Sequence, residues 1–161
     1  MKILVFNKDH PKLNTGYAKC LREIWINRLS KKYSIAAYST IPSMMFFDEF
    51  RGVKIYNEMS NKSCDLVSGE PSLLKIYKQF GADLYFTQID AFVFDKTCEW
   101  SKQGKINWVA YIPIDFDPVP EPILTRLSCA NGVITMSKWA KDKLKKLNNV
   151  LGYVYHGVDA N

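Results

Sequence analysis

The chain has 161 residues, of which 47% are hydrophobic, 24% charged and 14% aromatic. This composition excludes an intrinsically disordered chain, and the length allows one ordinary domain with a substantial core. The net charge of +6 accompanies no basic stretch interleaved with aromatic residues, so nucleic acid is not an expected partner. No apolar run is long enough to cross a bilayer, and residues 1–6 are too short for a signal peptide. We therefore expect a soluble, cytoplasmic protein.

The cysteine and histidine pattern is sparse. The cysteines are far apart, form no C-x-x-C pair and are accompanied by only two histidines: Cys20, Cys64, Cys98, Cys129, His10 and His156. This is not the pattern of a zinc site, so no metal is expected. In a cytoplasmic chain, we expect the cysteines to be reduced thiols that pack as small hydrophobic residues.

The first half of the chain alternates strand and helix patterns. Residues 2–6 are continuously apolar, as in a strand buried on both faces, and residues 7–16 form a polar loop. A helix then follows, which Asn14 or Thr15 can cap, with an inner face of Tyr17, Leu21, Ile24, Trp25 and Leu29. A short strand, an irregular segment, a second short strand and a loop are expected at 34–38, 39–52, 53–56 and 57–70.

The second half continues the alternation. Pro71 opens a helix that Gly81 ends, with an inner face of Leu73, Leu74, Tyr77 and Phe80. Strands are expected at 84–87, 107–112, 133–136 and 151–155. Helices are expected at 91–103, after the proline-rich loop 113–122, and at 138–147, the last with Trp139, Ala140, Leu144 and Leu147 inside.

This alternation predicts a single-domain, Rossmann-like α/β fold, with a parallel sheet of about seven strands and helices on both faces. Ligands of such sheets bind at the carboxyl ends of the strands. The loops that could form a site are therefore 7–16, 88–91, 113–120, 137–138 and 156–161.

Several common motifs are missing. The chain has neither the dinucleotide fingerprint nor a P-loop, and no G-x-S-x-G nucleophile elbow. The triplet Asp115-Phe116-Asp117 has the D-x-D form of a metal-holding sequence, but such a triplet often arises by chance.

Three segments resemble the retaining GT-B glycosyltransferases of family 4. They are Asn14-Thr15-Gly16-Tyr17-Ala18, Tyr111-Ile112-Pro113-Ile114-Asp115, and the stretch from Leu127 to Asp159. The last combines a strand, Ser137 and a helix with Tyr155-His156-Gly157-Val158-Asp159, which matches the family's interdomain signature. The resemblance spans nearly the whole chain and is loose between residues 39 and 83.

The resemblance implies a set of site residues, each with a structural alternative. Asp115 is implied in acceptor binding or acid/base assistance, and otherwise caps the following loop, which is the favoured role for Asp117. The implied substrate-binding residues are Asn14, Thr15, Gly16, Tyr17, Ser137, His156, Gly157 and Asp159. Gly16 could equally serve a tight turn, Ser137 is a good helix cap in any protein, and His156-Gly157 could form a turn.

The resemblance also implies a function. Residues 1–161 match the acceptor-side domain, and the donor-binding C-terminal domain of the family is absent from this sequence. Members transfer a sugar of a nucleotide-sugar co-substrate to an acceptor hydroxyl, without a metal or a tightly bound cofactor, as hexosyltransferases do. The acceptor would be a sugar or a lipid-linked molecule. By itself, the chain is expected to bind weakly and to be inactive.

Alternatives remain open at this point. The donor-binding domain could be supplied in cis, in a longer protein, or in trans by a partner subunit, and a trans partner predicts an exposed apolar patch. The chain could instead be a non-catalytic Rossmann-like interaction or regulatory module. A receiver domain is disfavoured, since Asp9 is the only acidic residue after the first strand. Lysines of 138–147 suggest an anionic membrane surface as a further partner, although a solvated helix face is the simpler explanation.

Overall fold

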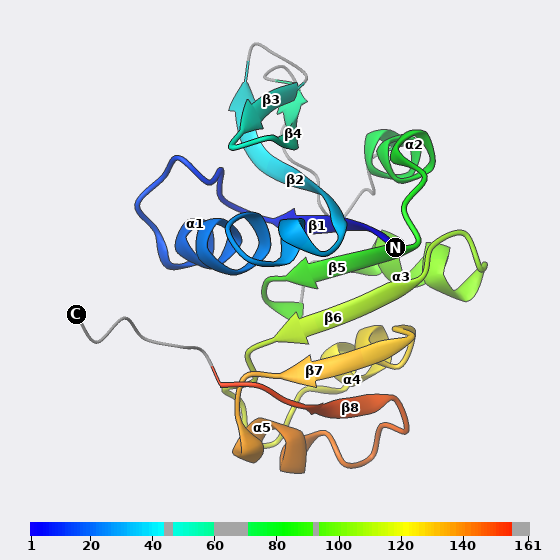
Figure 1. Cartoon of the computed structure of the whole chain (residues 1–161). Helices are drawn as coiled ribbons and strands as arrows, with labels where there is room; N and C mark the ends of the chain where they lie inside the picture. Colours follow the sequence, from blue (N-terminus) through cyan, green and yellow to red (C-terminus); the bar gives the residue numbers. More distant parts are fainter. Residues whose placement is uncertain (44–46, 60–70, 92–93, 156–161) are drawn as a thin grey trace.

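The structure, a computed structural model, describes residues 1–43, 47–59, 71–91 and 94–155. Within these ranges the chain forms an eight-stranded sheet of order β3-β4-β2-β1-β5-β6-β7-β8 (Figure 1). The strands are β1 (Lys2–Asn7), β2 (Ser34–Ser43), β3 (Phe47–Phe50), β4 (Val53–Met59), β5 (Leu84–Gln88), β6 (Trp108–Ile112), β7 (Gly132–Thr135) and β8 (Val150–Tyr153). The helices are α1 (Gly16–Cys20), η1 (Leu21–Ile26), η2 (Leu29–Lys31), α2 (Pro71–Phe80), α3 (Asp95–Lys102), α4 (Glu121–Leu127) and α5 (Lys138–Lys143).

The sheet confirms the predicted Rossmann-like α/β class and adds one strand. Every strand pair is parallel except β3–β4, which is an antiparallel hairpin at one edge. Its turn uses Arg51 and Gly52, both with positive φ (51° and 78°), as tight hairpin turns require. The prediction that 39–52 is irregular was wrong for 39–43 and 47–50, because Asp48 and Glu49 interrupt the apolar pattern of a buried strand. Residues 44–46 lie outside the described residues.

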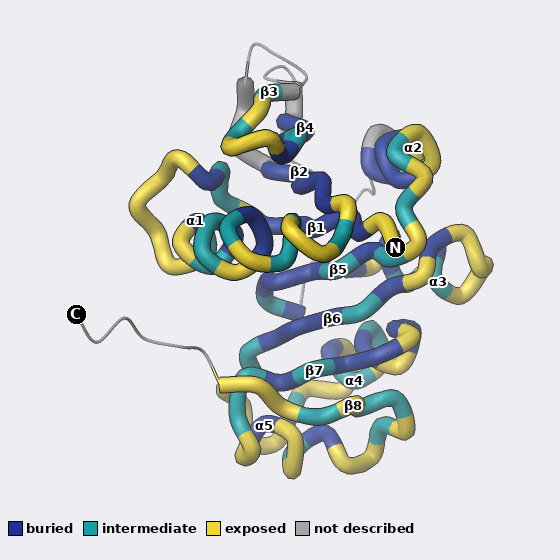
Figure 2. The backbone as a smooth tube through the Cα atoms, viewed as in Figure 1, coloured by how far each residue is buried: buried dark blue, intermediate teal, exposed yellow. Residues whose placement is uncertain are grey.

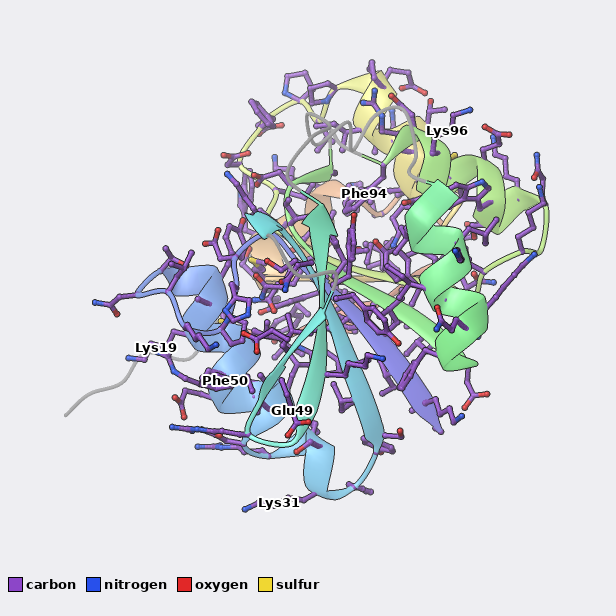
Figure 3. The ribbon with its side chains drawn as sticks, turned by 90° about the horizontal axis from the view of Figure 1, so that it is seen from above. Lys19, Lys31, Glu49, Phe50, Phe94 and Lys96 are labelled. Atoms are coloured by element: carbon purple, nitrogen blue, oxygen red, sulfur yellow. A yellow bond between two sulfur atoms is a disulfide. The ribbon has the colours of Figure 1, made fainter. Side chains whose placement is uncertain are left out.

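Two hydrophobic cores lie on opposite faces of the sheet, as the apolar strands predict (Figures 1 and 2). On one face, η1 packs Leu21, Trp25 and Ile26 against β1, β2 and β4. On the other face, α2 to α5 cover the sheet, and the fully buried Trp108 packs against Phe94 with ring centroids 5.0 Å apart. Figure 3 shows Phe94 directed into the interior.

The first helix differs from the prediction. Only Gly16–Cys20 is α-helical, and Leu21–Ile26 forms a π-helix in which the N–H of Asn27 donates to the carbonyl of Arg22 (2.9 Å). The wider turn shifts the buried stripe to Leu21, Trp25 and Ile26. Ile24, predicted on the inner face, is therefore 43% exposed.

The later helices follow their predictions, with shifted ends. Helix α2 runs from Pro71 to Phe80, and Gly81 ends it with φ 67°. Helix α5 is shorter than predicted, and Trp139, predicted to be inside, is 45% exposed, with the Lys143 ammonium 5.3 Å from its ring centroid. Among the described residues, no helix combines the length and the apolar character needed to span a bilayer.

The expectation of reduced thiols was wrong for two cysteines. Cys98 of α3 and Cys129, just after α4, form a disulfide, while Cys20 is free and Cys64 lies outside the described residues. Sequence spacing cannot reveal this pair, because 31 residues separate its members. The packing of α3 beside α4 brings their Cα atoms to 5.1 Å, and a salt bridge between Arg126 and Asp95 joins the same helices.

Breaking the Cys98–Cys129 bond should lower the free energy of unfolding by about 2–4 kcal/mol, because the bond restricts the unfolded chain over a loop of 31 residues. Urea unfolding of the wild type with and without dithiothreitol, and of Cys98→Ser, measures this loss. Cys20→Ser is the matched control and should unfold like the wild type. Equal unfolding midpoints in the oxidised and reduced wild type would contradict the assignment.

Candidate functional site

The carboxyl ends of the parallel strands meet at one edge of the sheet, opposite the edge where β1 starts (Figure 1). The strand order reverses at β1: the chain passes from β1 to β2 on one side, and β5 joins on the other. The connections after β1 and β5 therefore diverge, and doubly wound sheets bind ligands in a crevice at such a switch point. We call the region between these two connections, residues 7–17 and 88–90, the β1–β5 crevice.

A row of polar side chains crosses the sheet at this edge. Across the strands β4, β2, β1, β5 and β6, its members are Asn57, Ser39, Asn7, Gln88 and Tyr111. The sheet register pairs Ser39 with Asn57, Asn7 with Gln88, and Gln88 with Tyr111. Asn7 is level with Ser39 because the preceding residues, Phe6 and Tyr38, form a pair. All five members of the row are buried. Asn7 lies on the same face of β1 as Ile3 and Val5, because residues two apart in a strand share a face, and the side chains of Ile3 and Val5 belong to the core under η1. The row therefore lies on the sheet face that α1 and η1 cover.

Asn7 connects this row to the loop and helix above it. Its Nδ2 donates to the carbonyl of Tyr17 (2.9 Å), and its Oδ1 accepts from the N–H of Asp9 (3.2 Å). Thr15 donates to the Asp9 carboxylate and accepts from the N–H of Ala18 (3.2 Å), which caps α1. The start of α1 is thereby fixed over the ends of β1 and β5.

The predicted residues of this first segment have different environments. Thr15 uses its hydroxyl within the cap, and Tyr17 is half-buried next to the row. Asn14 is exposed in the loop. Gly16 is also exposed, has no positive φ, and a Cβ built there would meet nothing within 4 Å. No tight turn requires a glycine at this position.

Two tyrosines frame the crevice. Burial raises the pKa of the Tyr17 phenol, and the carboxylates of Asp90 and Asp9 raise it further. Burial also raises the pKa of Tyr111, to about 12, and the nearby Cys20 thiol adds to this shift. The Tyr111 hydroxyl donates to the carbonyl of Val154 (2.9 Å), which ties the end of β6 to the chain that leaves β8.

The exit of β6 contains the predicted Asp115. It is exposed, while its neighbour Ile114 is buried. Asp117 accepts from the Lys143 ammonium (2.5 Å), so it links the loop to α5 in a structural role. The loop therefore presents Asp115, rather than Asp117, to solvent as a carboxylate without an ion pair among the described residues.

Ser137 lies at the exit of β7, where it caps α5. Its Oγ accepts from the N–H of Ala140 (3.1 Å), and its carbonyl accepts from the Thr135 hydroxyl (2.9 Å). The structure thus brings Thr15 and Tyr17 to the β1–β5 crevice and places Asp115 and Ser137 at the exits of the next strands along the edge. The predicted residues His156, Gly157 and Asp159 lie outside the described residues.

Other polar groups hold the loop after β1 in place. The Lys12 ammonium donates to the Asp48 carboxylate (2.5 Å), and His10 Nε2 is 3.6 Å from the same group. Burial and the charge of Lys12 lower the pKa of His10. Arg22 of η1 donates to the carbonyl of Pro11 (2.7 Å). These contacts join the loop to β3 and η1.

The described part of the chain contains no group of three or more His, Cys, Asp or Glu side chains that could hold a metal ion. A shallow depression lies elsewhere, on α2, lined by Leu74, Lys75, Lys78 and Gln79. The carboxyl end of α2 lies beside the start of β1, where Lys2 Nζ donates to the carbonyl of Phe80. The depression is therefore remote from the crevice.

The sequence analysis named the loops that lie at this edge but did not name four of the polar residues found there. Asn7, Gln88, Asp9 and Asp90 were not among the candidates, although the loops 7–16 and 88–91 were. The available signal was a polar amide at the end of an otherwise apolar strand. Such a residue is buried with the strand, yet it needs a polar partner at the sheet edge.

Comparison with known proteins gives a likeness of fold. No family model matches the chain, and no curated protein matches it. Among solved structures, the chain is similar to sucrose-phosphate synthase from Thermosynechococcus elongatus, with a TM-score of 0.61 and 13% sequence identity. The match covers 100% of this chain and 91% of that chain. At this identity the likeness shows a shared fold.

Tyr111→Phe should change how stability depends on alkaline pH. In the folded protein Tyr111 keeps its proton up to about pH 12, whereas an unfolded tyrosine ionises near 10.0, so wild-type stability falls as the pH rises between these values. The variant lacks the hydrogen bond to Val154, so at neutral pH its free energy of unfolding should be about 1 kcal/mol lower than that of the wild type. Because the variant has no phenol at this position, its stability does not fall through ionisation of residue 111 at alkaline pH. Urea unfolding at several pH values measures the difference in free energy of unfolding between wild type and variant, and this difference should become smaller above pH 10.0. A constant gap would contradict the shifted pKa.

Proposed function

We propose that residues 1–161 form the acceptor-side domain of a GT-B glycosyltransferase of the family 4 type. The fold likeness to sucrose-phosphate synthase, a glycosyltransferase, supports a glycosyltransferase-like domain. The observation that supports an acceptor site most directly is the set of half-buried groups Asp9, Tyr17 and Asp90, which lies beyond the buried polar row at the point where the strand order reverses. Hydroxyl groups of an acceptor are suited to hydrogen-bond with such carboxylates and phenols.

In this proposal, the chain positions the acceptor, and a second domain binds the nucleotide-sugar, in cis or in trans. Transfer is retaining and needs no metal, so rate acceleration comes from positioning and from hydrogen bonds to the departing diphosphate. Asp115 binds an acceptor hydroxyl or assists proton transfer. His156, Gly157 and Asp159, which lie outside the described residues, are proposed to bind substrate, as the family resemblance implies, and the chain by itself transfers nothing.

The structure changes how two proposed residues would act. The hydroxyls of Thr15 and Ser137 already cap α1 and α5, so each would contribute mainly by fixing the backbone around it. Among the described residues, no hydrogen bond engages the N–H of Gly16 or of Tyr17. These two N–H groups, together with the exposed side chain of Asn14 and the Tyr17 hydroxyl, are therefore the donors of this segment that a ligand could use.

Exposed apolar side chains support a second candidate, an interaction module that pairs with a partner subunit. Beside the exits of β6, β7 and β8, the chain exposes Phe116 (46%), Trp139 (45%), Val154 (58%) and Tyr155 (63%). A domain that docks in trans would need such a surface. The same surface suits a donor-binding domain in cis, so both arrangements share it.

An anionic membrane surface is a further proposed partner, with the protein cytoplasmic and peripheral. The side chains of Lys138, Lys141, Lys145 and Lys146 are exposed on and after α5. The exposed Trp139 adds an aromatic side chain of the kind that lies at membrane interfaces.

Asp115→Asn should weaken the binding of a neutral sugar acceptor by about tenfold, because a charge-assisted hydrogen bond is replaced by a neutral one. Titration of the 15N-labelled chain with a panel of monosaccharides and disaccharides measures this. Shifts are expected in the amides of 9–17 and 113–117. Asp142→Asn, which removes an exposed carboxylate on α5, is the control. An absence of sugar-induced shifts in the wild type, or robust transfer by the isolated chain, would contradict the proposal.

Vesicle sedimentation tests the membrane surface. The chain should pellet with vesicles of phosphatidylglycerol and phosphatidylcholine but not with phosphatidylcholine alone, and added salt should release it. Replacing Lys141 and Lys145 by Gln should reduce binding, by about 1 kcal/mol for each lysine removed. Replacing Lys75 and Lys78 on α2 is the matched control. Binding that does not depend on the anionic lipid would exclude this partner.

A further inference from the structure

Part of one sheet face has no helix over it. The core under η1 is built on β1, β2 and β4, and it ends at Phe86 of β5, whose ring centroid lies 4.6 Å from that of Trp25. Among the described residues, this core includes none from β6, β7 or β8, and α3 to α5 pack on the opposite face. Figure 1 shows these three strands uncovered beside α1 and η1. Parallel strands are normally covered on both faces, so this surface is suited to pack against another layer.

Two strands contribute half-buried apolar side chains to the uncovered surface. Val109 of β6 pairs in register with Phe86, and Ile134 of β7 pairs with Tyr111, which follows Val109 by two residues. Because residues two apart in a strand share a face, Val109 and Ile134 lie on the same sheet face as Phe86. Both side chains are half-buried, although they belong to strands in the interior of the sheet.

Leu151 of the edge strand β8 extends this surface. It is the extra residue between the two residues of β8 that pair with Val133 and Ile134, as in a β-bulge. Its side chain bends over β7, because a Cβ built on Gly132, the register partner of Val109, would lie 2.5 Å from Leu151 Cδ1. Leu151 is nevertheless 66% exposed (Figure 2). We call the surface of Val109, Ile134 and Leu151 the bare face.

The side of η1 forms a step next to the bare face. Cys20, at the start of η1, lies near Tyr111 of β6. Ile24 follows Cys20 by four residues, so it lies on the same side of the helix, and it is 43% exposed. A helix is about 10 Å thick, and stacked sheets lie about 10 Å apart. The edge of a second sheet laid on the bare face would therefore meet the side of η1.

We propose that the bare face is an interface between two copies of this chain, related by a two-fold axis parallel to the strands. Such an axis lays β6 to β8 of each copy over β6 to β8 of the other. It also places the edge strand β8 of each copy beside η1 of the other, so that Ile24 of one copy lies near Leu151 of its partner at both ends of the contact. The step at η1 fixes the sideways position of the two sheets, and the contact is closed.

Charge and size favour a second copy as the occupant. The chain has a net charge of +6, but none of the strands β5 to β8 contains a charged residue, so two bare faces meet without like charges in contact. Three strands of this length give a face about 14 Å wide and about 13 Å long. With the two junctions between η1 and β8, the contact covers roughly 600 Å² per copy, at the small end of specific interfaces. The carboxyl edge of each sheet stays open, so the inference is independent of acceptor binding.

Sedimentation equilibrium of the chain from about 5 µM to about 500 µM tests the dimer, for which we expect a dissociation constant of about 10–100 µM. Leu151→Glu and Ile24→Glu should each weaken the dimer by at least about tenfold, because each places two carboxylates in an apolar contact. Phe116→Glu and Leu13→Glu add the same charge at exposed apolar positions outside the bare face. These controls should dimerise like the wild type, and circular dichroism checks that every variant is folded.

Alkylation of Cys20 is a second measurement, which needs no variant. Its rate, followed on the Cys20 peptide by mass spectrometry, should fall by about threefold over the same concentration range, because the dimer covers that side of η1. A wild type that stays monomeric at the highest concentration would overturn the inference. So would a dimer that Phe116→Glu disrupts and Leu151→Glu does not, since another surface then forms it. A dimer unaffected by Ile24→Glu would also overturn it, because pairing of two β8 edges does not involve η1.

Discussion

The amide of Asn7 is the contact on which the arrangement of the crevice depends. It is fully buried at the end of the central strand β1, where an unsatisfied amide would cost about 1–3 kcal/mol. The Tyr17 carbonyl and the Asp9 N–H satisfy it, and both belong to the segment that crosses above the sheet. One side chain therefore determines where the loop after β1 turns, where α1 starts, and how Tyr17 and Asp9 face the end of β5.

The two faces of the sheet differ in how apolar they are. The face covered by α2 to α5 contains most of the large buried side chains and the disulfide. The other face has a smaller core under η1, which gives way to the polar row at the carboxyl edge. Polar side chains are tolerated there because the loop and the start of α1 provide hydrogen-bond partners.

The fold was largely predictable, because apolar runs of four to six residues alternate with helical spacings, and local sequence determines both. The features that were not predicted depend on contacts between residues that are far apart in the sequence. Strand β3 forms only because it pairs with β4, so its charged residues gave no strand pattern. Trp139 was placed on the inner face with Ala140 and Leu144, but in α5 it is exposed and lies against Lys143 rather than the core. The disulfide requires α3 and α4 to be neighbours.

The same reasoning applies to the site. Thr15 and Tyr17 come from a loop that resembles a known family, and both are held above the end of β1; their role in binding stays a prediction. Asn7 and Gln88 became recognisable only when the register aligned them across adjacent strands. Asp90 was missed for a similar reason, because its relation to Tyr17 depends on the order β1-β5 rather than on the sequence.

The two edges of the sheet differ chemically, and this limits how copies of the chain can assemble. Edge strand β3 has charged residues, and its Asp48 is joined to the loop after β1, which discourages pairing with another strand. Edge strand β8 has no charged residue, and its Leu151 is 66% exposed. Between copies of the chain, edge pairing is therefore favoured between two β8 strands over pairing of β8 with β3. A β8–β8 contact is two-fold and closed, whereas a β8–β3 contact would be head-to-tail and could extend into open-ended fibres.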